Sequence, residues 1–169
     1  MTIGFLGTGR IAAPMVRALA RDGYDILVSE RNAEVSEALA VQFDTVSVSD
    51  NRGVVAGSDV VVLCLLASVA RRELPGLPFR AEQKVISVMA EMSLEEIAGM
   101  IGDMRELCVA IPMPFVDSGG CPLAVYPESA TLVELFGRQN TVIPVRSEAA
   151  MKPHFAATAL TSTLMKELM

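Results

Sequence analysis

A glycine-rich turn follows the first apolar stretch of this chain and is the feature best suited to chemistry. Residues 7–12 read Gly-Thr-Gly-Arg-Ile-Ala, which fits the pattern G-x-G-x-x-A, and they come directly after the strand-like residues 2–6. Glycines let the backbone turn tightly and approach a pyrophosphate, whose charge is met by the free N–H groups and the positive dipole end of the following helix. The turn therefore predicts a dinucleotide ligand, and a purely structural glycine turn is the alternative.

An acidic residue stands at the spacing that such a ligand requires. A second strand-like stretch begins at Tyr24 and ends at Glu30, about 20 residues after Gly9, where a carboxylate binds the adenosine ribose hydroxyls. A surface acid without a ligand is the alternative for Glu30. The order of strand, glycine turn, helix, strand and acid favours the dinucleotide.

Composition and charge limit the classes of partner. The chain has 169 residues, enough for one well-buried main domain, and 51% of them are hydrophobic, so we expect part of the surface to be covered. A net charge of −6 disfavours nucleic acid. The longest apolar run, residues 60–67, is far shorter than the ~20 residues that span a bilayer, and Met1 leads directly into the first strand. We expect a cytoplasmic protein without a membrane segment.

Cysteine and histidine usage disfavours metal and hydrolase chemistry. Cys64, Cys108 and Cys121 are odd in number and widely spaced, so we expect buried free thiols rather than a disulfide or a metal site. His154 is the single histidine, which excludes a multi-histidine zinc site and leaves any Ser-His-Asp triad dependent on it alone. We expect no metal, and the catalytic residues stay unassigned.

Strand-like and helical stretches alternate along the chain. We expect strands over 2–6, 24–28, 45–48, 59–65, 84–88, 106–110, 123–126 and 141–145, and helices over 10–21, 33–42, 94–101 and 129–136. This alternation predicts an α/β fold, namely a doubly wound, mostly parallel sheet of the Rossmann type with a C-terminal helix. Residues 60–65 are apolar on both faces and belong in the sheet interior.

Local signals mark one helix start and one domain boundary. Ser93 and Glu96 form a capping box, in which Ser93 accepts from the Glu96 N–H while Glu96 reaches back. We expect residues 1–146 to form the dinucleotide-binding domain, and residues 147–169 to start a helical region that pairs two copies of the chain as a homodimer. Packing of the last helix on its own domain is the alternative, and Pro153 indicates a start or kink.

Many stretches resemble the pyrroline-5-carboxylate reductase family. They are residues 4–9, 29–32, 50–51, 57–63, 85–90, 93–96, 110–114 and 123–127. The resemblance implies an NAD(P)-dependent oxidoreductase of proline biosynthesis, which transfers a hydride to the C=N bond of a small cyclic imine. It also implies a cofactor domain followed by a helical domain that dimerises and completes the substrate site. Because the chain stops at Met169, we expect a truncated or minimal relative.

The resemblance also implies cofactor contacts. The pyrophosphate would be held by Gly7, Thr8, Gly9, Arg10 and Ile11, the adenosine by Asn51, and the rest of the cofactor by Cys64, Leu65 and Leu66. Ser29 and Arg31 match positions that take the 2′-phosphate of NADP, since a guanidinium pairs bidentately with phosphate. Glu30 would repel that phosphate, so NADP and NAD both stay open. The alternatives are solvated surface charges for Arg10 and Arg31, and a helix-capping role for Asn51.

Departures from the family's motifs leave the substrate open. Leu66 and Ala67 replace a Lys-Pro pair beside the nicotinamide, and residues 111–115 replace a Met-Pro-Asn-Thr-Pro segment. Where the family has a Ser-Gly-Ser-Gly-Pro substrate helix, Thr161, Ser162 and Thr163 are the candidate contacts for a substrate carboxylate, with helix-surface hydroxyls as the alternative.

Two other functions remain open. One is a dinucleotide-binding module without independent catalysis, which acts as a sensor or as half of an enzyme. The other is a deazaflavin-dependent NADP reductase, which shares the opening motif and the fold. All three interpretations require NADP or NAD, and the two enzymes add a small-molecule substrate.

Overall fold

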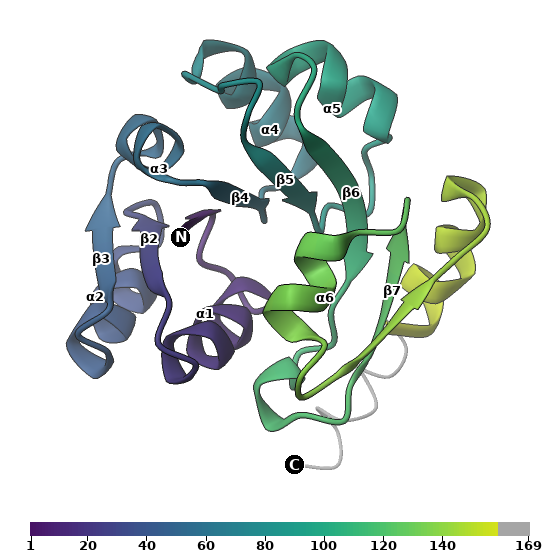
Figure 1. Cartoon of the computed structure of the whole chain (residues 1–169). Coiled ribbons are helices and arrows are strands. Elements are labelled where there is room, and N and C mark those ends of the chain that lie inside the picture. The colour runs from purple at the N-terminus through teal and green to yellow at the C-terminus, as the bar shows by residue number, and fades with distance from the viewer. Residues whose placement is uncertain (159–169) are drawn as a thin grey trace.

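In the computed structural model, which describes residues 1–158, helices cover both faces of one eight-stranded sheet (Figure 1). The strands are β1 (Thr2–Leu6), β2 (Asp25–Ser29), β3 (Val46–Ser49), β4 (Val60–Leu63), β5 (Lys84–Ser87), β6 (Glu106–Ile111), β7 (Pro122–Tyr126) and β8 (Thr141–Pro144). The α-helices are α1 (Ala12–Arg21), α2 (Ala33–Gln42), α3 (Asn51–Gly57), α4 (Ala67–Glu73), α5 (Leu94–Ile101) and α6 (Ala130–Phe136). Three short 3-10 turns are η1 (Leu74–Gly76), η2 (Val116–Ser118) and η3 (Glu148–Ala150). Residues 151–158 are helical and are called the last helix below.

The strand order is β3-β2-β1-β4-β5-β6-β7-β8. From β3 to β6 all neighbours pair in parallel, whereas β7 runs antiparallel to β6, and β8 runs parallel to β7. The chain winds outward from β1 to β3 and then returns to place β4 on the other side of β1. Doubly wound sheets bind ligands at this switch point, outside the carboxyl ends of the strands. The predicted fold class is confirmed.

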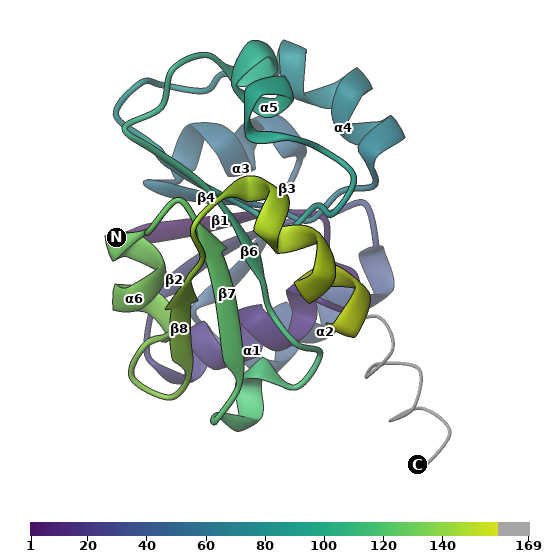
Figure 2. The same cartoon turned by 90° about the vertical axis from the view of Figure 1, so that its right-hand side faces the viewer.

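The two faces of the sheet have separate apolar cores. Side chains alternate between faces along a strand, so Phe5 packs in the cluster under α1, α2 and α6, while Leu6 packs in the cluster under α3, α4 and α5. Figures 1 and 2 show these two groups of helices on opposite sides of the sheet. The four residues of β4 are fully buried, which confirms its predicted interior position.

Helix starts agree in part with the sequence signals. The Ser93 hydroxyl accepts from the Glu96 N–H at 3.1 Å, as predicted. The Glu96 carboxylate does not reach back, because it accepts from Arg71 Nε at 2.6 Å instead. The proposed capping role of Asn51 is wrong, since the cap of α3 is Asp50, whose Oδ1 accepts from the Gly53 N–H at 2.7 Å.

The described part of the last helix packs on its own domain. Met151 is 2% exposed and lies in a cluster with Val109, Ile111 and Ala124, against which Phe155 also packs. The Glu148 carboxylate, just before the helix, accepts from the Leu94 N–H at 2.8 Å. The predicted substrate contacts Thr161, Ser162 and Thr163 lie outside the described residues. Among residues 1–158, no helix has the length and apolar character needed to cross a membrane.

Candidate functional site

The glycine loop, residues 7–11, lies at the switch point between β1 and β4. Gly7 has a φ of +96°, and a Cβ built on it would lie 2.5 Å from the carbonyl oxygen of Cys64. Glycine is therefore required here for the backbone conformation and for the close approach to the end of β4. A Cβ built on Gly9 meets no atom within 4 Å among residues 1–158, its chain neighbours aside. The loop thus packs tightly through its first glycine and leaves open space at its second.

The first turn of α1 offers backbone donors beside that space. Gly9 O accepts from the Ala13 N–H at 3.0 Å, so helical hydrogen bonding starts inside the loop. Ile11 at the N-cap supplies no side-chain cap, and the first turn holds no acid. Among the other helices, α3, α5 and α6 are capped by Asp50, Ser93 and Ser129, whereas α2 and α4, like α1, have no side-chain cap. The N–H groups that begin α1 are left for a ligand, and their dipole favours an anion.

Two side chains from the end of β2 hold the loop in place. The Gly7 N–H donates to Ser29 Oγ at 2.8 Å, and Asn32 Nδ2 donates to Thr8 O at 3.2 Å. Ser29 is fully buried beneath the glycine loop and supports it. It therefore does not face a 2′-phosphate, contrary to the expectation from the resemblance. The Thr8 side chain is 1% exposed, and its Oγ1 has no hydrogen-bond partner among the described residues.

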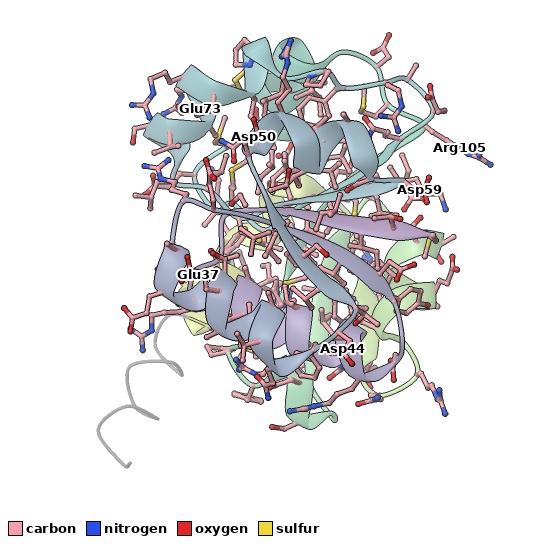
Figure 3. The ribbon with its side chains drawn as sticks, turned by 90° about the vertical axis from the view of Figure 1, so that its left-hand side faces the viewer. Glu37, Asp44, Asp50, Asp59, Glu73 and Arg105 are labelled. Carbon is pink, nitrogen blue, oxygen red and sulfur yellow. The ribbon has the colours of Figure 1, made fainter. Side chains whose placement is uncertain are left out.

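A hollow of about 590 Å³ lies beside the ends of β2 and β3. It brings together Glu30, Arg31 and Asn51, as the resemblance implied for the adenosine end of a cofactor. Glu30 and Arg31 are exposed, and their side chains make no hydrogen bond or ion pair within residues 1–158. In Figure 3, Asp50 and Glu73, which also line this hollow, lie on the side of the molecule opposite Asp59 and Arg105.

The hollow includes residues that the sequence did not indicate. Arg52 and Arg72 line it, and they come from α3 and α4. The guanidinium of Arg52 donates to Gly76 O at 3.1 Å, and that of Arg72 pairs with Glu73 at 3.0 Å. No motif surrounds Arg72, so only the fold reveals it, whereas Arg52 directly follows Asn51. Asn32, by contrast, could have been found, because it directly follows Arg31 in a stretch that carries the resemblance.

The end of β4 is apolar and holds no reactive thiol. Leu65 is buried and Leu66 is 74% exposed, while burial raises the pKa of the Cys64 thiol far above its ordinary value. Burial likewise raises the pKa of Cys108 to about 12 and that of Cys121 above its ordinary value. All three cysteines are free and protonated at neutral pH, so none of them is an activated nucleophile.

One family's sequence pattern matches more than half of the chain. This is the family described as NADP oxidoreductase, coenzyme F420-dependent, and its pattern matches residues 2–91. No curated protein sequence matches the chain. The family's description agrees with the predicted cofactor, NADP or NAD.

Three solved structures with a similar fold are two pyrroline carboxylate reductases and a reductive aminase. The 1-pyrroline-5-carboxylate reductase of Streptococcus pyogenes has a TM-score of 0.79 at 20% identity, over 99% of this chain and 66% of that one. The Plasmodium falciparum pyrroline carboxylate reductase with NADP bound has a TM-score of 0.76 at 13% identity, over 99% and 65%. A reductive aminase from Aspergillus terreus, in complex with NADPH and ethyl-5-oxohexanoate, has a TM-score of 0.71 at 16% identity, over 97% and 61%. The predicted resemblance is confirmed for the fold, and the chain spans about two thirds of these proteins or less.

Proposed function

The chain belongs to the family described as NADP oxidoreductase, coenzyme F420-dependent, and on that premise we propose that it binds NADP(H) and catalyses hydride transfer to a small imine. The observation that carries the proposal is the open position at Gly9, at the start of an uncapped helix and at the switch point of the sheet. A diphosphate fits that position, because backbone donors and the helix dipole surround it. The unpaired Thr8 Oγ1 offers a further polar contact.

The two ends of the cofactor have separate neighbours in this chain. Asn51 borders the adenosine, and the free guanidinium of Arg31 pairs with the 2′-phosphate, with Arg72 in the same hollow. Glu30 opposes that choice, so NADP preference is a balance between neighbouring charges of opposite sign. At the other end, Leu65 and Leu66 border the nicotinamide with apolar surface.

The protein's part in the reaction is positioning and exclusion of water. Bound reduced nicotinamide supplies a hydride. The glycine loop would hold the diphosphate, and the buried end of β4 would limit how far the cofactor enters the site. Together they would set the distance between the nicotinamide and the hydride acceptor, and the face of the nicotinamide that reacts. The protonated thiol of Cys64 puts no charge beside the ring. An imine is protonated easily, so the reaction does not require a strong acid from this chain.

A C=N bond is proposed as the acceptor because the similar structures are named as pyrroline carboxylate reductases and as a reductive aminase. We also propose that the region 147–169 pairs two copies of the chain and that the dimer is the active form. Sedimentation of the purified chain tests the dimer, and a monomer with full turnover contradicts it.

Binding and turnover together test the proposal. Titration of NADPH, followed by its fluorescence, should give saturable binding, and NADPH should be oxidised when cyclic imines such as 1-pyrroline-5-carboxylate are added. If NADPH binds but neither an imine nor F420 is turned over, also when the C-terminal domain of a related reductase is supplied, the chain is a binding module. If NADPH and NADH both fail to bind, the whole proposal fails.

Coenzyme F420 is the second candidate acceptor, because the family's description names it. A deazaflavin also accepts a hydride, and the same cradle would hold the NADPH. Oxidation of NADPH with F420, measured beside the imine assay on one preparation, separates the two acceptors.

A further inference from the structure

A second hollow, of about 460 Å³, lies beyond the carboxyl end of β5. We call it the α5 cavity. Residues 90–93, between β5 and α5, form one wall, Val109 of β6 forms the floor, and η3 and the last helix form the other wall. Figure 2 shows the last helix in front of β6 and β7, on the side of the sheet where α5 lies.

The α5 cavity has an apolar interior and two free charges at its rim. Met92, Val109 and Met151 are 5%, 3% and 2% exposed. Glu91 and Lys152 are exposed lining residues, and neither side chain makes a hydrogen bond or ion pair with another described residue. Glu148 also lines the cavity, but its carboxylate is bound to the Leu94 N–H. The free groups are therefore one carboxylate and one ammonium group.

Two other charges act on this rim, the hydrogen-bonded Glu148 carboxylate and the Arg71 guanidinium. Glu91 lies near enough to Arg71 to contribute to the raised pKa of the Arg71 guanidinium. The hydrogen bonds of that guanidinium, however, go to the Glu96 carboxylate at 2.6 and 3.3 Å. The Glu91 carboxylate thus keeps its own hydrogen-bonding capacity for a ligand.

The proposed cofactor contacts and this cavity follow one another along the same edge of the sheet. The adenosine hollow adjoins the ends of β2 and β3, the glycine loop follows β1, and Leu65 and Leu66 follow β4. Ala90 and Glu91 follow β5, which lies next to β4 and therefore about 4.8 Å further along the edge. A molecule in the α5 cavity would thus lie beside the nicotinamide end of a bound cofactor.

We propose that the α5 cavity is the pocket for the second substrate, and that Glu91 and Lys152 are its charged contacts. The cavity takes a compact molecule with an apolar body, a protonated nitrogen facing Glu91 and a carboxylate facing Lys152. The substrate contacts would then lie within the described residues rather than at Thr161, Ser162 and Thr163. This inference rests on the proposed function, because the cofactor site defines which end of the edge is reactive.

Three rings of equal size test the charged contacts separately. L-proline carries both charges, cyclopentanecarboxylate carries the negative charge, and pyrrolidine carries the positive one. With NADPH present, L-proline should shift the methyl NMR signals of Met92 and Met151 in methionine-labelled protein, and should leave that of Met15, under α1, in place. Lys152→Gln should weaken L-proline and cyclopentanecarboxylate about tenfold but not pyrrolidine. Glu91→Gln should weaken L-proline and pyrrolidine but not cyclopentanecarboxylate.

Two control variants and a parallel measurement of NADPH binding separate failure of this inference from failure of the proposed function. Lys84→Gln, at the amino end of β5, and Glu95→Gln, on α5 outside the cavity lining, should leave the affinity for all three rings unchanged. If L-proline shifts neither methyl signal while NADPH binds, or if the control variants lose as much affinity, the inference is overturned and the proposed function stands. If L-proline shifts the signals but no nicotinamide cofactor binds, the proposed function fails, and the assignment of the cavity as a second-substrate pocket fails with it.

Discussion

The two glycines of the loop have different roles, because only one of them faces protein atoms. A Cβ on Gly7 would collide with the Cys64 carbonyl, whereas a Cβ on Gly9 would enter open space. Gly9→Val should therefore leave the melting temperature within a few degrees and weaken NADPH binding about a hundredfold, through loss of the diphosphate contacts. Fluorescence titration and thermal unfolding measure the two effects. Gly99→Val is the control, since Gly99 also has open space but lies in α5, and unchanged affinity of Gly9→Val would refute the loop assignment.

Glu30 and Arg31 should have opposite effects on cofactor choice. Glu30→Ser removes the charge that repels a 2′-phosphate, so the ratio of NAD to NADP dissociation constants should rise about tenfold. Arg31→Ser should lower that ratio by a similar factor. Glu37→Ser, on α2 and outside the lining of the hollow, should leave it unchanged. A ratio that stays the same in the Glu30 and Arg31 variants would mean that neither side chain meets the ribose.

Ser29 supports the loop from a buried position. Ser29→Ala leaves the Gly7 N–H without its acceptor, and an unpaired buried donor lowers the free energy of unfolding by about 1–3 kcal/mol. Affinity for NADPH should fall as well, because the loop loses its anchor. Chemical denaturation measures the first effect, and exposed Ser68→Ala serves as the control. A stability loss no larger than that of the control would remove Ser29 from this role.

The site was predictable where its residues are close in sequence. Gly7, Gly9 and Glu30 form a local pattern, and Arg31 and Asn51 each stand two residues after the last residue of β2 and β3. The burial of Ser29 was not predictable, because it depends on the packing of β1 beside β2. Arg72 was missed for the same kind of reason, since it lines the hollow from helix α4, 41 residues after Arg31 along the chain and too far for any local motif.

At the scale of elements, helix α4 shows how weak local signals hide a helix. It has seven residues, Leu66 gives it no side-chain cap, and η1 with Pro75 and Gly76 follows at once. Packing stabilises it instead, because Ala67, Val69 and Ala70 are buried in the cluster under α3, α4 and α5. Helix α5, with a capping serine and a clear apolar face, was predicted with its observed bounds.

An ion pair joins α4 to α5 and should show in a pH titration. The hydrogen bond from Arg71 holds the pKa of Glu96 below its ordinary value of 4.5. The stabilisation is therefore present above the unfolded pKa and is lost as the pH falls through the lower, folded pKa. In Arg71→Gln, the pKa of Glu96 should rise toward the ordinary value, as measured by carbon NMR of the carboxyl group.

Arg72→Gln is the matched control for this titration. Arg72 is the next residue of α4 but pairs with Glu73, so its loss should leave the Glu96 titration unchanged. An equal change in both variants would show that net charge, rather than the Arg71 contact, sets the pKa of Glu96.

For the last elements of the chain, β7, α6, β8 and the last helix, the sequence predicted the positions along the chain but not the packing. The strands at 123–126 and 141–145 and the helix at 129–136 lie close to their observed bounds. Their pairing directions depend on connections that carry no local signal. The contact of Met151 with Val109 and Ala124 was left open for the same reason, since the sequence shows several apolar faces on the last helix.

For the whole molecule, the three cysteines report on global unfolding. Burial raises the pKa of each thiol, to about 12 for Cys108, and the reactive form of a thiol is the thiolate. Native protein at pH 8 should therefore react with Ellman's reagent at least about a hundredfold more slowly than protein unfolded in urea. Full reaction of one equivalent at the unfolded rate in the native protein would show that a thiol lies in an accessible, ionised state.

The candidate sites lie at the carboxyl ends of the strands, on the opposite side of the molecule from the residues that precede the strands. The glycine loop, the adenosine hollow and the α5 cavity follow strand ends, whereas Asp44, Asp59 and Arg105 precede the strands β3, β4 and β6. Figure 3 shows Asp59 and Arg105 far from Asp50 and Glu73. A cysteine or linker introduced at Arg105 would consequently immobilise the protein on a sensor chip with its entire ligand-facing margin turned to the flowing solution.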